Sequence, residues 1–265
     1  MALRRWHELA SETLAACDRA ATVAVLPLAA TEQHGPHLPL GTDFFIAEGM
    51  LAATAERVPA EVPVLVMPTM PVGASAEHGR FAGTLSLPAA ALIEAIAAIA
   101  AGVAASGLSK LAIVTAHGGN VAAMTAAALE CRTRHGLVAV ATSFARLGVP
   151  PDFVDERELE TGIHGGLVET ALMLHFRPEL VEMGKAADFA SRQSELARRH
   201  RHLRVHGPIG YGWLADDLNP QGVVGNAAAA TPEIGAAIAR HRAERLAELL
   251  AEISGAPLDS LLSRP

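Results

Sequence analysis

Short apolar runs alternate along this chain with longer segments that are alanine-rich or amphipathic. Four of the runs predict buried strands, at residues 21–28, 62–67, 111–115 and 137–142. The segments between them predict helices at 43–58, from about 88 to a terminating Gly107, and at 121–134. This alternation of strands and helices predicts an α/β fold with a mainly parallel sheet and helices on both faces.

The rest of the chain predicts further helices and two long loops. Helices are expected at 3–19 and 164–175, and Thr231-Pro232-Glu233 predicts the start of a last helix that reaches about residue 253. Residues 145–163 are acidic and contain proline, so we interpret them as a loop or lid. Residues 206–225 contain several glycines and predict a long functional loop. With no internal repeat, we expect one domain over residues 1–265.

The most informative chemical signal follows the first apolar run, in residues 32–43. Glu32 and His34 are two positions apart at a strand end, so their side chains point to the same side of the chain. Asp43 stands where the next helix begins, which suits either a metal ligand or an N-cap residue. Carboxylates combined with imidazole favour Zn²⁺ or Mn²⁺ over Ca²⁺. The alternative is a turn-rich loop whose polar groups cap a helix.

Two more segments carry the same combination of residues. The predicted strand at 111–115 runs into His117-Gly118-Gly119-Asn120, and a later segment holds His164 and Glu169. In open α/β sheets, ligands bind at the carboxyl ends of the strands, where the first two clusters are expected. Three clusters of one chemistry predict a metal site.

Composition restricts the classes of protein that this sequence can be. Hydrophobic residues make up 51% of the 265 residues and charged residues 18%, which fits a substantial core and buried subunit contacts. The net charge of −7 argues against a nucleic-acid or anionic-membrane partner. Cys17 and Cys131 fit neither a zinc spacing nor a disulfide framework, and the N-terminus lacks an apolar signal segment, so we expect a cytoplasmic protein. Glu94 interrupts the longest apolar run, which is therefore not expected to span a membrane.

Four motifs together resemble the creatininase family of metal-dependent amidohydrolases, over about residues 20–250. They are Glu32-Gln-His-Gly-Pro-His-Leu-Pro-Leu-Gly-Thr-Asp43, Glu77-His-Gly-Arg-Phe-Ala-Gly-Thr-Leu-Ser-Leu87, His117-Gly-Gly-Asn120 and His164-Gly-Gly-Leu-Val-Glu-Thr170. The resemblance implies a three-layer α/β/α sandwich, two divalent metal ions per subunit, and a homo-oligomer such as a hexamer. It also implies hydrolysis of an amide-type C–N bond. Zn²⁺ and Mn²⁺ are the expected ions, with Fe²⁺ as a further candidate.

The resemblance assigns metal-binding roles to individual residues. Asp43 matches a carboxylate that bridges both ions. Glu32 and His117 match ligands of one ion, and His34 matches a ligand of the other. Creatinine-hydrolysing members take the remaining carboxylate from a His-Tyr-Glu-Asn segment, which is His117-Gly-Gly-Asn120 in this chain. Glu169 is therefore the candidate for this ligand, with a catalytic role as well, unless it only caps its helix.

Proton transfer and substrate contacts are implied in the same way. His164 matches the family's proton-transfer histidine, which would protonate the departing nitrogen. The alternative is that His164 only neighbours a helix N-cap. Ser75 and Gly118 are expected to contact the substrate. Three more residues are expected to support the ligands and their loops: His37, His78 and Asn120.

The expected substrate is a small-molecule amide, either a cyclic amide or a formamide. Creatinine itself fits poorly, because Glu160 and Thr161 replace a Trp-Asp pair that precedes the proton-transfer histidine in creatinine hydrolases. No tryptophan lies between Trp6 and Trp213, so a flat heterocycle would lose its stacking surface. One alternative is a peptidase of the mycofactocin-precursor type.

Two further alternatives belong to other functional classes. One is a family member that binds metal without turnover, although the presence of His164 argues against it. The other is a metallophosphoesterase, which would need a basic residue at the site. Only Arg80 and Lys110 lie near the motifs.

Overall fold

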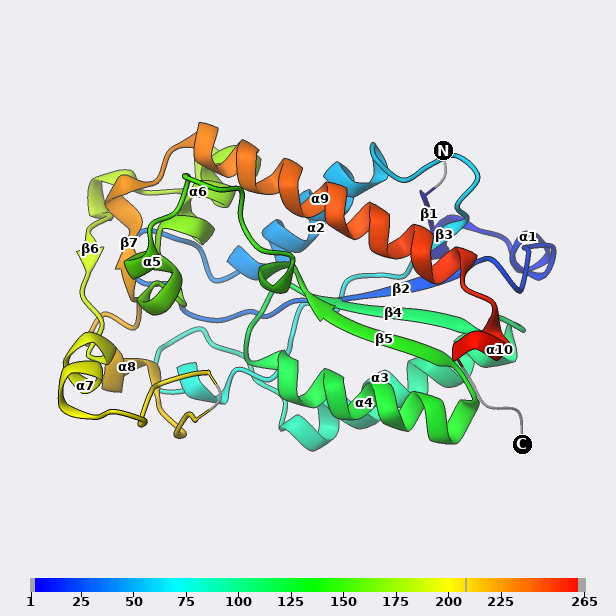
Figure 1. Ribbon diagram of the computed structural model, residues 1–265, viewed down its shortest axis with the longest axis horizontal. Coiled ribbons are helices and arrows are strands. Elements are labelled where there is room, and N and C mark those ends of the chain that lie inside the picture. The colour runs from blue at the N-terminus through cyan, green and yellow to red at the C-terminus, as the bar shows by residue number, and fades with distance from the viewer. Residues whose placement is uncertain (1–2, 208, 262–265) are drawn as a thin grey trace.

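Five strands form a parallel sheet at the centre of the structure (Figure 1). The computed structural model describes residues 3–207 and 209–261. The strands are β1 (Leu3–Arg5), β2 (Val23–Leu28), β3 (Val64–Val66), β4 (Lys110–Thr115) and β5 (Val138–Ser143), in the order β1-β3-β2-β4-β5. Every neighbouring pair in this sheet is parallel, which confirms the predicted sheet.

Helices cover both faces of the sheet. One face carries α2 (Thr42–Ala55), α6 (Leu167–Phe176) and α9 (Pro232–Gly255), and the other carries α3 (Ala89–Ala105) and α4 (Asn120–His135) (Figure 1). Alternate residues of β2 enter two separate cores. Val23 and Val25 pack in the core with α2 and α9, whereas Ala24 and Leu26 pack in the core with α3 and α4. This arrangement is the expected α/β/α sandwich.

Helix ends follow the local signals in the sequence. Thr231 caps α9, because its Oγ1 accepts a hydrogen bond from the Ile234 N–H at 3.3 Å. Gly107 follows α3 with a φ of +80°, a conformation that glycine adopts without strain. The predicted boundaries of these two helices are therefore confirmed at these ends.

The first segment of the chain differs from its prediction. Instead of a helix over 3–19, the structure has β1, a 3₁₀ turn at Trp6–Glu8 and the short helix α1 (Ser11–Ala15). Residues 3–5 pair with β3 as the edge strand of the sheet. Pairing with this distant strand overrides the local helical pattern, so the predicted helix is wrong.

The two predicted loops contain short helices. Residues 145–163 include part of a 3₁₀ helix, Phe144–Leu147, and the helix α5 (Glu156–Thr161), whose N-cap Asp155 accepts a hydrogen bond from the Glu158 N–H at 2.7 Å. Residues 206–225 include α8 (Ala215–Leu218). The remaining short elements are α7 (Gln193–Arg199), α10 (Leu258–Leu261), the antiparallel pair β6 (Asp188–Phe189) and β7 (Gly225–Asn226), and 3₁₀ helices at Ala76–His78, Pro178–Leu180, Met183–Lys185 and Ala227–Ala229.

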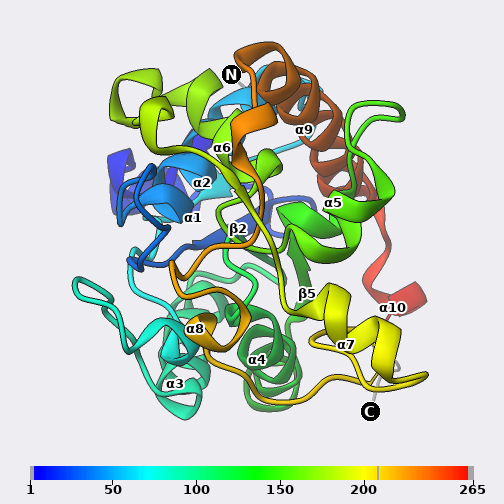
Figure 2. The same cartoon turned by 90° about the vertical axis from the view of Figure 1, so that its left-hand side faces the viewer.

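The carboxyl ends of β2, β4 and β5 lie at one edge of the sheet, and Figure 2 looks onto this edge. The segments around it include α5, α6, α7 and α8 (Figure 2). Loops that follow different strands can therefore meet here. Within the described ranges, no helix combines the length and the apolar character of a membrane span.

Candidate metal centre

The three predicted ligand clusters meet at the carboxyl edge of the sheet. Glu32 and His34 follow β2, and His117 follows β4. Asp43 lies in the first turn of α2, and Glu169 lies in the first turn of α6. We call these five residues the metal cluster. All are buried except Glu169, whose side chain is 22% exposed.

The metal cluster contains two overlapping groups of three ligands. Glu32, Asp43 and His117 form one group, and His34, Asp43 and Glu169 form the other; within each group the ligand atoms lie within 4.8 Å of one another. The His117 Nδ1 atom lies 3.7 Å from Asp43 Oδ2, and the His34 Nε2 atom lies 3.9 Å from the same oxygen. Asp43 is thus placed where a bridging carboxylate would be needed.

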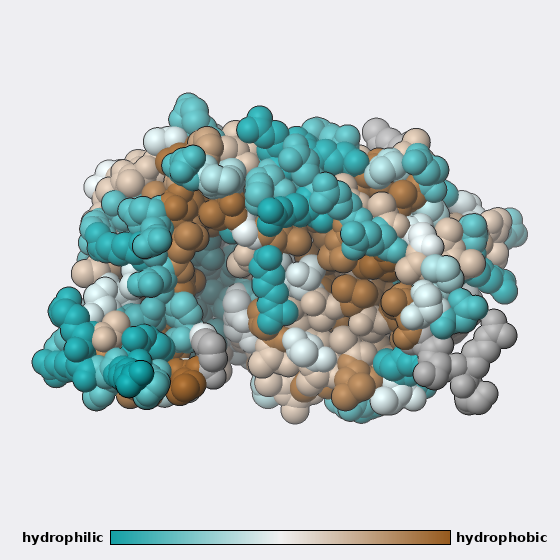
Figure 3. Space-filling model, in the orientation of Figure 1, coloured by the Kyte–Doolittle hydropathy of each residue, from teal (hydrophilic) through white to brown (hydrophobic). Residues whose placement is uncertain are grey.

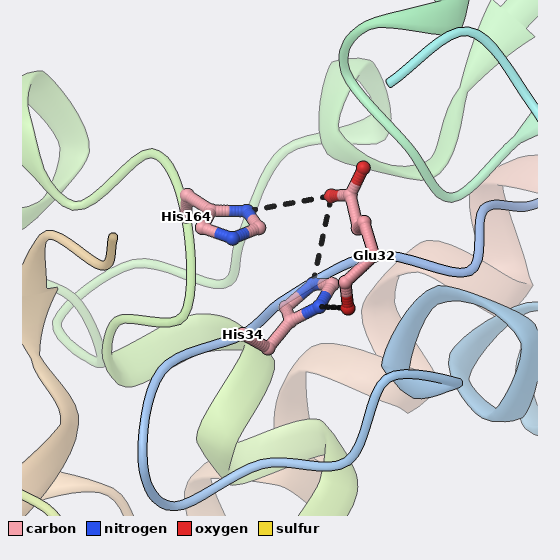
Figure 4. A group of neighbouring side chains, drawn as sticks. All are labelled: Glu32, His34 and His164. Atoms are coloured by element: carbon pink, nitrogen blue, oxygen red, sulfur yellow. Dashed lines mark hydrogen bonds and ion pairs between the residues drawn. The ribbon is translucent and has the colours of Figure 1, made fainter. Parts of the chain in front are cut away.

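A third group brings in His164. Its Nδ1 atom lies 3.6 Å from Glu32 Oε1, and the His34 Nε2 atom lies 3.9 Å from that oxygen (Figure 4). The centroids of the two imidazole rings are 4.3 Å apart. This geometry is compatible with proton transfer by His164 and also with a ligand role, so its predicted role stays a prediction.

Backbone carbonyls fix the tautomers of the three central histidines. The His34 Nδ1–H donates to the Glu32 carbonyl at 3.1 Å. The His117 Nε2–H donates to the Ala74 carbonyl at 2.9 Å, and the His164 Nε2–H donates to the Gln33 carbonyl at 2.8 Å. In the neutral rings, the second nitrogen therefore presents a lone pair to the carboxylates, as a metal ligand or a base requires.

Several buried polar atoms in the cluster have no hydrogen-bond partner among the described residues. They are Glu32 Oε2, His34 Nε2 and Asp43 Oδ2, whereas Glu32 Oε1 lies 3.1 Å from His117 Nδ1. Leaving such atoms unpaired away from water is costly, and buried charges are usually paired or bind metal. Carboxylate oxygens and imidazole nitrogens that converge in this way fit Zn²⁺ or Mn²⁺.

The alternative role, capping of a helix N-terminus, differs between Asp43 and Glu169. Gly41 is the N-cap residue of α2, so the N-cap role for Asp43 is wrong. Gly166 is the N-cap residue of α6, and the Glu169 Oε2 atom accepts a hydrogen bond from the Gly165 N–H at 2.7 Å. The same oxygen lies 3.6 Å from His34 Nε2. Glu169 therefore stabilises the start of α6 and also faces the metal cluster.

The charges of the cluster shift the pKa values of its members. Burial raises the pKa of Asp43 well above its usual range, and the nearby Glu32 carboxylate raises it further. Burial alone would lower the pKa of His117, but Glu32, Asp43 and Glu77 around the ring raise it to about 10. In the metal-free protein, a second proton on His117 therefore offsets part of the negative charge.

We expect metal affinity to fall as the pH falls. The pKa of His117 is raised to about 10, so its ring holds a second proton near neutral pH, and that proton must leave before Nδ1 binds an ion. The raised pKa of Asp43 lets protons compete with an ion for that carboxyl over a wider range of pH. Each displaced proton changes the apparent affinity by about tenfold per pH unit. Calorimetric titration with Zn²⁺ in buffers of different ionisation enthalpy counts the released protons.

A surface histidine provides the control for this titration. His135 bonds the Ala97 carbonyl of α3, on the opposite helix layer from α2 and α6, and His135→Gln should release the same number of protons as the unchanged protein. A binding heat that does not depend on the buffer would contradict the proposed proton displacement.

Asn120 and Gly119 hold the His117 loop in place. Asn120 is fully buried; its Oδ1 atom accepts the Ala74 N–H at 2.8 Å, and its Nδ2 atom donates to the Ala29 carbonyl at 3.1 Å. A Cβ atom at Gly119 would lie 2.3 Å from Glu77 Oε1 and 2.4 Å from His117 Nε2. Only glycine fits there, which explains the second glycine of the His117-Gly-Gly-Asn120 motif.

The other predicted supporting residues also contact the ligand loops. His37 Nε2 lies 2.9 Å from Thr170 Oγ1 in α6, and burial lowers its pKa to about 4. His78 Nδ1 accepts a hydrogen bond from Gln33 Nε2 at 2.8 Å, and its Nε2 atom lies 3.5 Å from Glu32 Oε1. Gln33 was missed in the sequence, although it stands between two predicted ligands.

A cavity of about 270 Å³ opens beside the metal cluster, and we call it the cluster cavity. Its lining comprises Glu77, His78, His117, Gly118, Gly119, Ile163, His164, Glu169, His206 and Trp213. Gly118 is thus placed for its predicted substrate contact. Ser75 is fully buried, with its Oγ atom 3.4 Å from His117 Nε2, and it does not line this cavity.

The cluster cavity contradicts one expectation about the substrate. Trp213 lines it, so the expected loss of an aromatic surface is wrong. The Trp213 Nε1–H donates to the Val205 carbonyl at 3.1 Å, which fixes the indole. Because Trp213 comes from the 206–225 segment, far from the motifs along the chain, no local signal reveals it.

Neither basic residue near the motifs reaches the metal cluster. Arg80 pairs with Asp216 in α8 at 2.9 Å and is exposed. Lys110 is buried, and its Nζ atom donates to the Ser254 and Ala256 carbonyls at 2.6 and 2.9 Å. Both side chains therefore have structural partners, and neither is available for a phosphate at the cluster.

Comparison with known proteins gives matches over most of the chain. A family model described as "Creatininase: Creatinine amidohydrolase" matches residues 7–250. The mycofactocin precursor peptide peptidase of Mycobacterium tuberculosis (strain H37Rv) is 35% identical over 177 residues, which span 64% of this chain and 65% of that protein. The creatinine amidohydrolase of Pseudomonas putida is 29% identical over 63% of this chain and 68% of its own length. A solved structure titled "Creatininase Mn" superposes with a TM-score of 0.76 at 22% identity, covering 95% of this chain and 99% of that one.

Proposed function

Since this chain belongs to the creatininase family of metal-dependent hydrolases, we propose that it hydrolyses an amide-type C–N bond at a centre of two divalent ions. One observation carries the proposal: two three-ligand groups share Asp43, and each group contributes one residue, His117 or Glu169, to the wall of the cluster cavity. Solved creatininases are described with manganese and with zinc, and either ion suits the oxygen and nitrogen ligands of this cluster.

We assign separate roles in hydrolysis to the metal cluster and to His164. Glu32 and His117 would hold one ion, and His34 and Glu169 the other, with Asp43 shared. When bound, such a pair of ions polarises a carbonyl and lowers the pKa of the attacking water. His164 lines the cavity, and its Nδ1 atom faces the cluster while Nε2–H is held by the Gln33 carbonyl. This geometry supports the proposal that His164 passes a proton to the departing nitrogen.

The size of the cluster cavity favours a small substrate. A volume of about 270 Å³ admits a cyclic amide or a formamide, and Trp213 contributes an aromatic side chain to the cavity wall. A peptide-derived amide is the second candidate, because the mycobacterial peptidase is more similar in sequence than the creatinine amidohydrolase. We also propose that the protein forms a homo-oligomer and that nucleic acid is not one of its partners.

Turnover of a substrate panel tests the proposal. The protein is stripped with a chelator, reloaded with Zn²⁺ or Mn²⁺, and offered lactams, formamides, short peptides and phosphoesters. We expect hydrolysis of at least one amide class only after reloading, and no phosphoester hydrolysis, because neither Arg80 nor Lys110 reaches the cluster.

Two outcomes would contradict this assignment. Phosphoester turnover would favour the metallophosphoesterase alternative. Tight metal binding without hydrolysis of any amide in the panel would favour a family member without turnover. The stripped protein is the matched control for both, since it keeps every side chain and lacks only the ions.

A further inference from the structure

A second, larger cavity lies next to the cluster cavity. It has a volume of about 470 Å³ and lies between α5, α6, α9 and the 3₁₀ helix after β5. Figure 3 shows the surface hollowed in this region, with apolar side chains at the rim. Much of the lining is aliphatic or aromatic, including Ile46, Phe144, Val149, Leu159, Val168 and Leu172. We call it the Arg242 cavity, after the cation that also lines it.

The Arg242 cavity adjoins the metal cluster. Glu169 and Ile163 line both cavities, and Ala116, which precedes His117, lines the larger one. A molecule in the Arg242 cavity would therefore reach one of the candidate metal ligands. This position fits a subsite for part of the substrate.

Arg242 is buried without an anionic partner. Its side chain projects from α9, and the residue is only 6% exposed. The Nε–H donates to the Gly148 carbonyl at 2.9 Å. Within the described part of the chain, its Nη1 and Nη2 atoms have no hydrogen-bond partner, and no carboxylate forms an ion pair with it within 4.0 Å. An uncompensated buried charge is costly, so an unpaired guanidinium facing a cavity indicates a missing anion.

The two acids in the lining already have other partners. Glu158 Oε1 accepts the Leu167 N–H at 2.7 Å, and its Oε2 atom accepts the Asn226 N–H at 2.8 Å. Glu169 accepts the Gly165 N–H and faces His34 in the metal cluster. Burial lowers the pKa of Arg242 to about 10, while Glu169 raises it, so the guanidinium is charged at neutral pH. Both acids are therefore engaged elsewhere, which leaves the guanidinium free for the anionic group of a bound molecule.

We propose that the Arg242 cavity binds the part of the substrate or product that carries a carboxylate beside an apolar group. The free Nη1 and Nη2 atoms of a planar guanidinium match the two oxygens of a carboxylate. One arginine among apolar side chains, with Glu158 nearby, fits a monoanion rather than a phosphate. The role of this subsite in catalysis rests on the proposed amide hydrolysis, but binding itself does not.

Ligand binding to the Zn²⁺-loaded protein tests the subsite without turnover. The probes are 4-phenylbutanoate and its uncharged isostere 5-phenylpentan-2-one, a ketone without a C–N bond to hydrolyse, each titrated by calorimetry. We expect the acid to bind about tenfold more tightly or better, the usual size of a charge-assisted hydrogen bond. Arg242→Met should remove this preference and leave ketone binding unchanged, and Arg242→Lys should retain part of the preference.

Arg245 provides a matched control on the same helix. Its Nη1 atom donates to the Leu147 carbonyl at 2.9 Å, so it anchors the same loop as Arg242 but does not line the cavity. Arg245→Gln should keep the full preference for the acid. If the preference also falls in Arg245→Gln, loop anchoring accounts for the effect and the proposal is overturned.

The remaining outcomes distinguish carboxylate binding at Arg242 from binding of the acid elsewhere in the protein. Equal binding of the acid and the ketone by the unchanged protein would overturn the proposal. A preference that survives in Arg242→Met would show that the acid binds the metal ions instead. If Arg242→Met does not fold, Arg242→Lys takes its place. Full preference for the acid in Arg242→Lys would overturn the proposed bidentate contact between the guanidinium and the carboxylate. The preference for the acid could depend on Arg242 even if the protein hydrolyses no amide. This result would support the subsite and contradict only the proposed function.

Discussion

Asp43→Ala is expected to lose both metal ions and, with them, all hydrolysis above background. Asp43 is the one residue that both three-ligand groups of the metal cluster share, and its Oδ2 atom has no hydrogen-bond partner within the described ranges. Metal analysis after dialysis should fall from about two ions per chain to near zero, since one carboxylate serves each ion of a two-metal site. Retention of full metal content would remove Asp43 from the bridging position.

Glu169→Gln is the matched control for this loss. Glu169 belongs to only one of the two groups, so its variant should weaken one ion selectively and keep the other. The glutamine can still accept the Gly165 N–H that stabilises the start of α6. Unchanged stoichiometry and affinity in this variant would mean that Glu169 acts only at the helix end.

His164→Ala is expected to keep both ions and the fold but to lose about 10²–10⁴-fold in turnover, the usual size of general acid–base catalysis. The Gln33 carbonyl holds its Nε2–H, and the free Nδ1 atom faces the cluster at the cavity wall. The loss should shrink for substrates whose leaving group is a weak base, because such groups depart without a proton. Initial rates on amides with graded leaving groups measure this dependence.

A variant at His206 is the control that distinguishes loss of proton transfer from a change in the shape of the cluster cavity. It also lines the cluster cavity, but its Nε2 atom bonds the Glu160 carbonyl, away from the ligands. His206→Gln should therefore show no dependence on the leaving group. Equal losses across leaving groups in His164→Ala would indicate positioning, and loss of metal would make His164 a ligand, as its place beside Glu32 and His34 allows.

The sheet and the ligand clusters can be predicted from the sequence because each strand runs directly into its own ligands. β2 is followed by Glu32 and His34, and β4 is followed by His117. Parallel strands bring such loops to one edge without any further information. Gly107 and Thr231 mark helix ends for a similarly local reason.

Residues that reach the site from distant elements cannot be predicted in this way. Trp213 enters the cluster cavity from the 206–225 segment, and Arg242 comes from a long amphipathic helix where a basic residue usually faces water. The first segment shows the same limit for the fold, because residues 3–5 become a strand only by pairing with β3. In each case, the decisive partner lies far away in the sequence.

The placement of the two cavities has a consequence for the evolution of this scaffold. The metal cluster is held by loops at strand ends and by the first turns of α2 and α6, whereas part of the wall of the Arg242 cavity comes from α5, α9 and the 3₁₀ helix after β5, which carry no residue of the metal cluster. Substitutions in these three elements can change which molecule is held while every ligand keeps its position. Mutational drift in these helices can therefore diversify the bound molecule without displacing the candidate metal ligands.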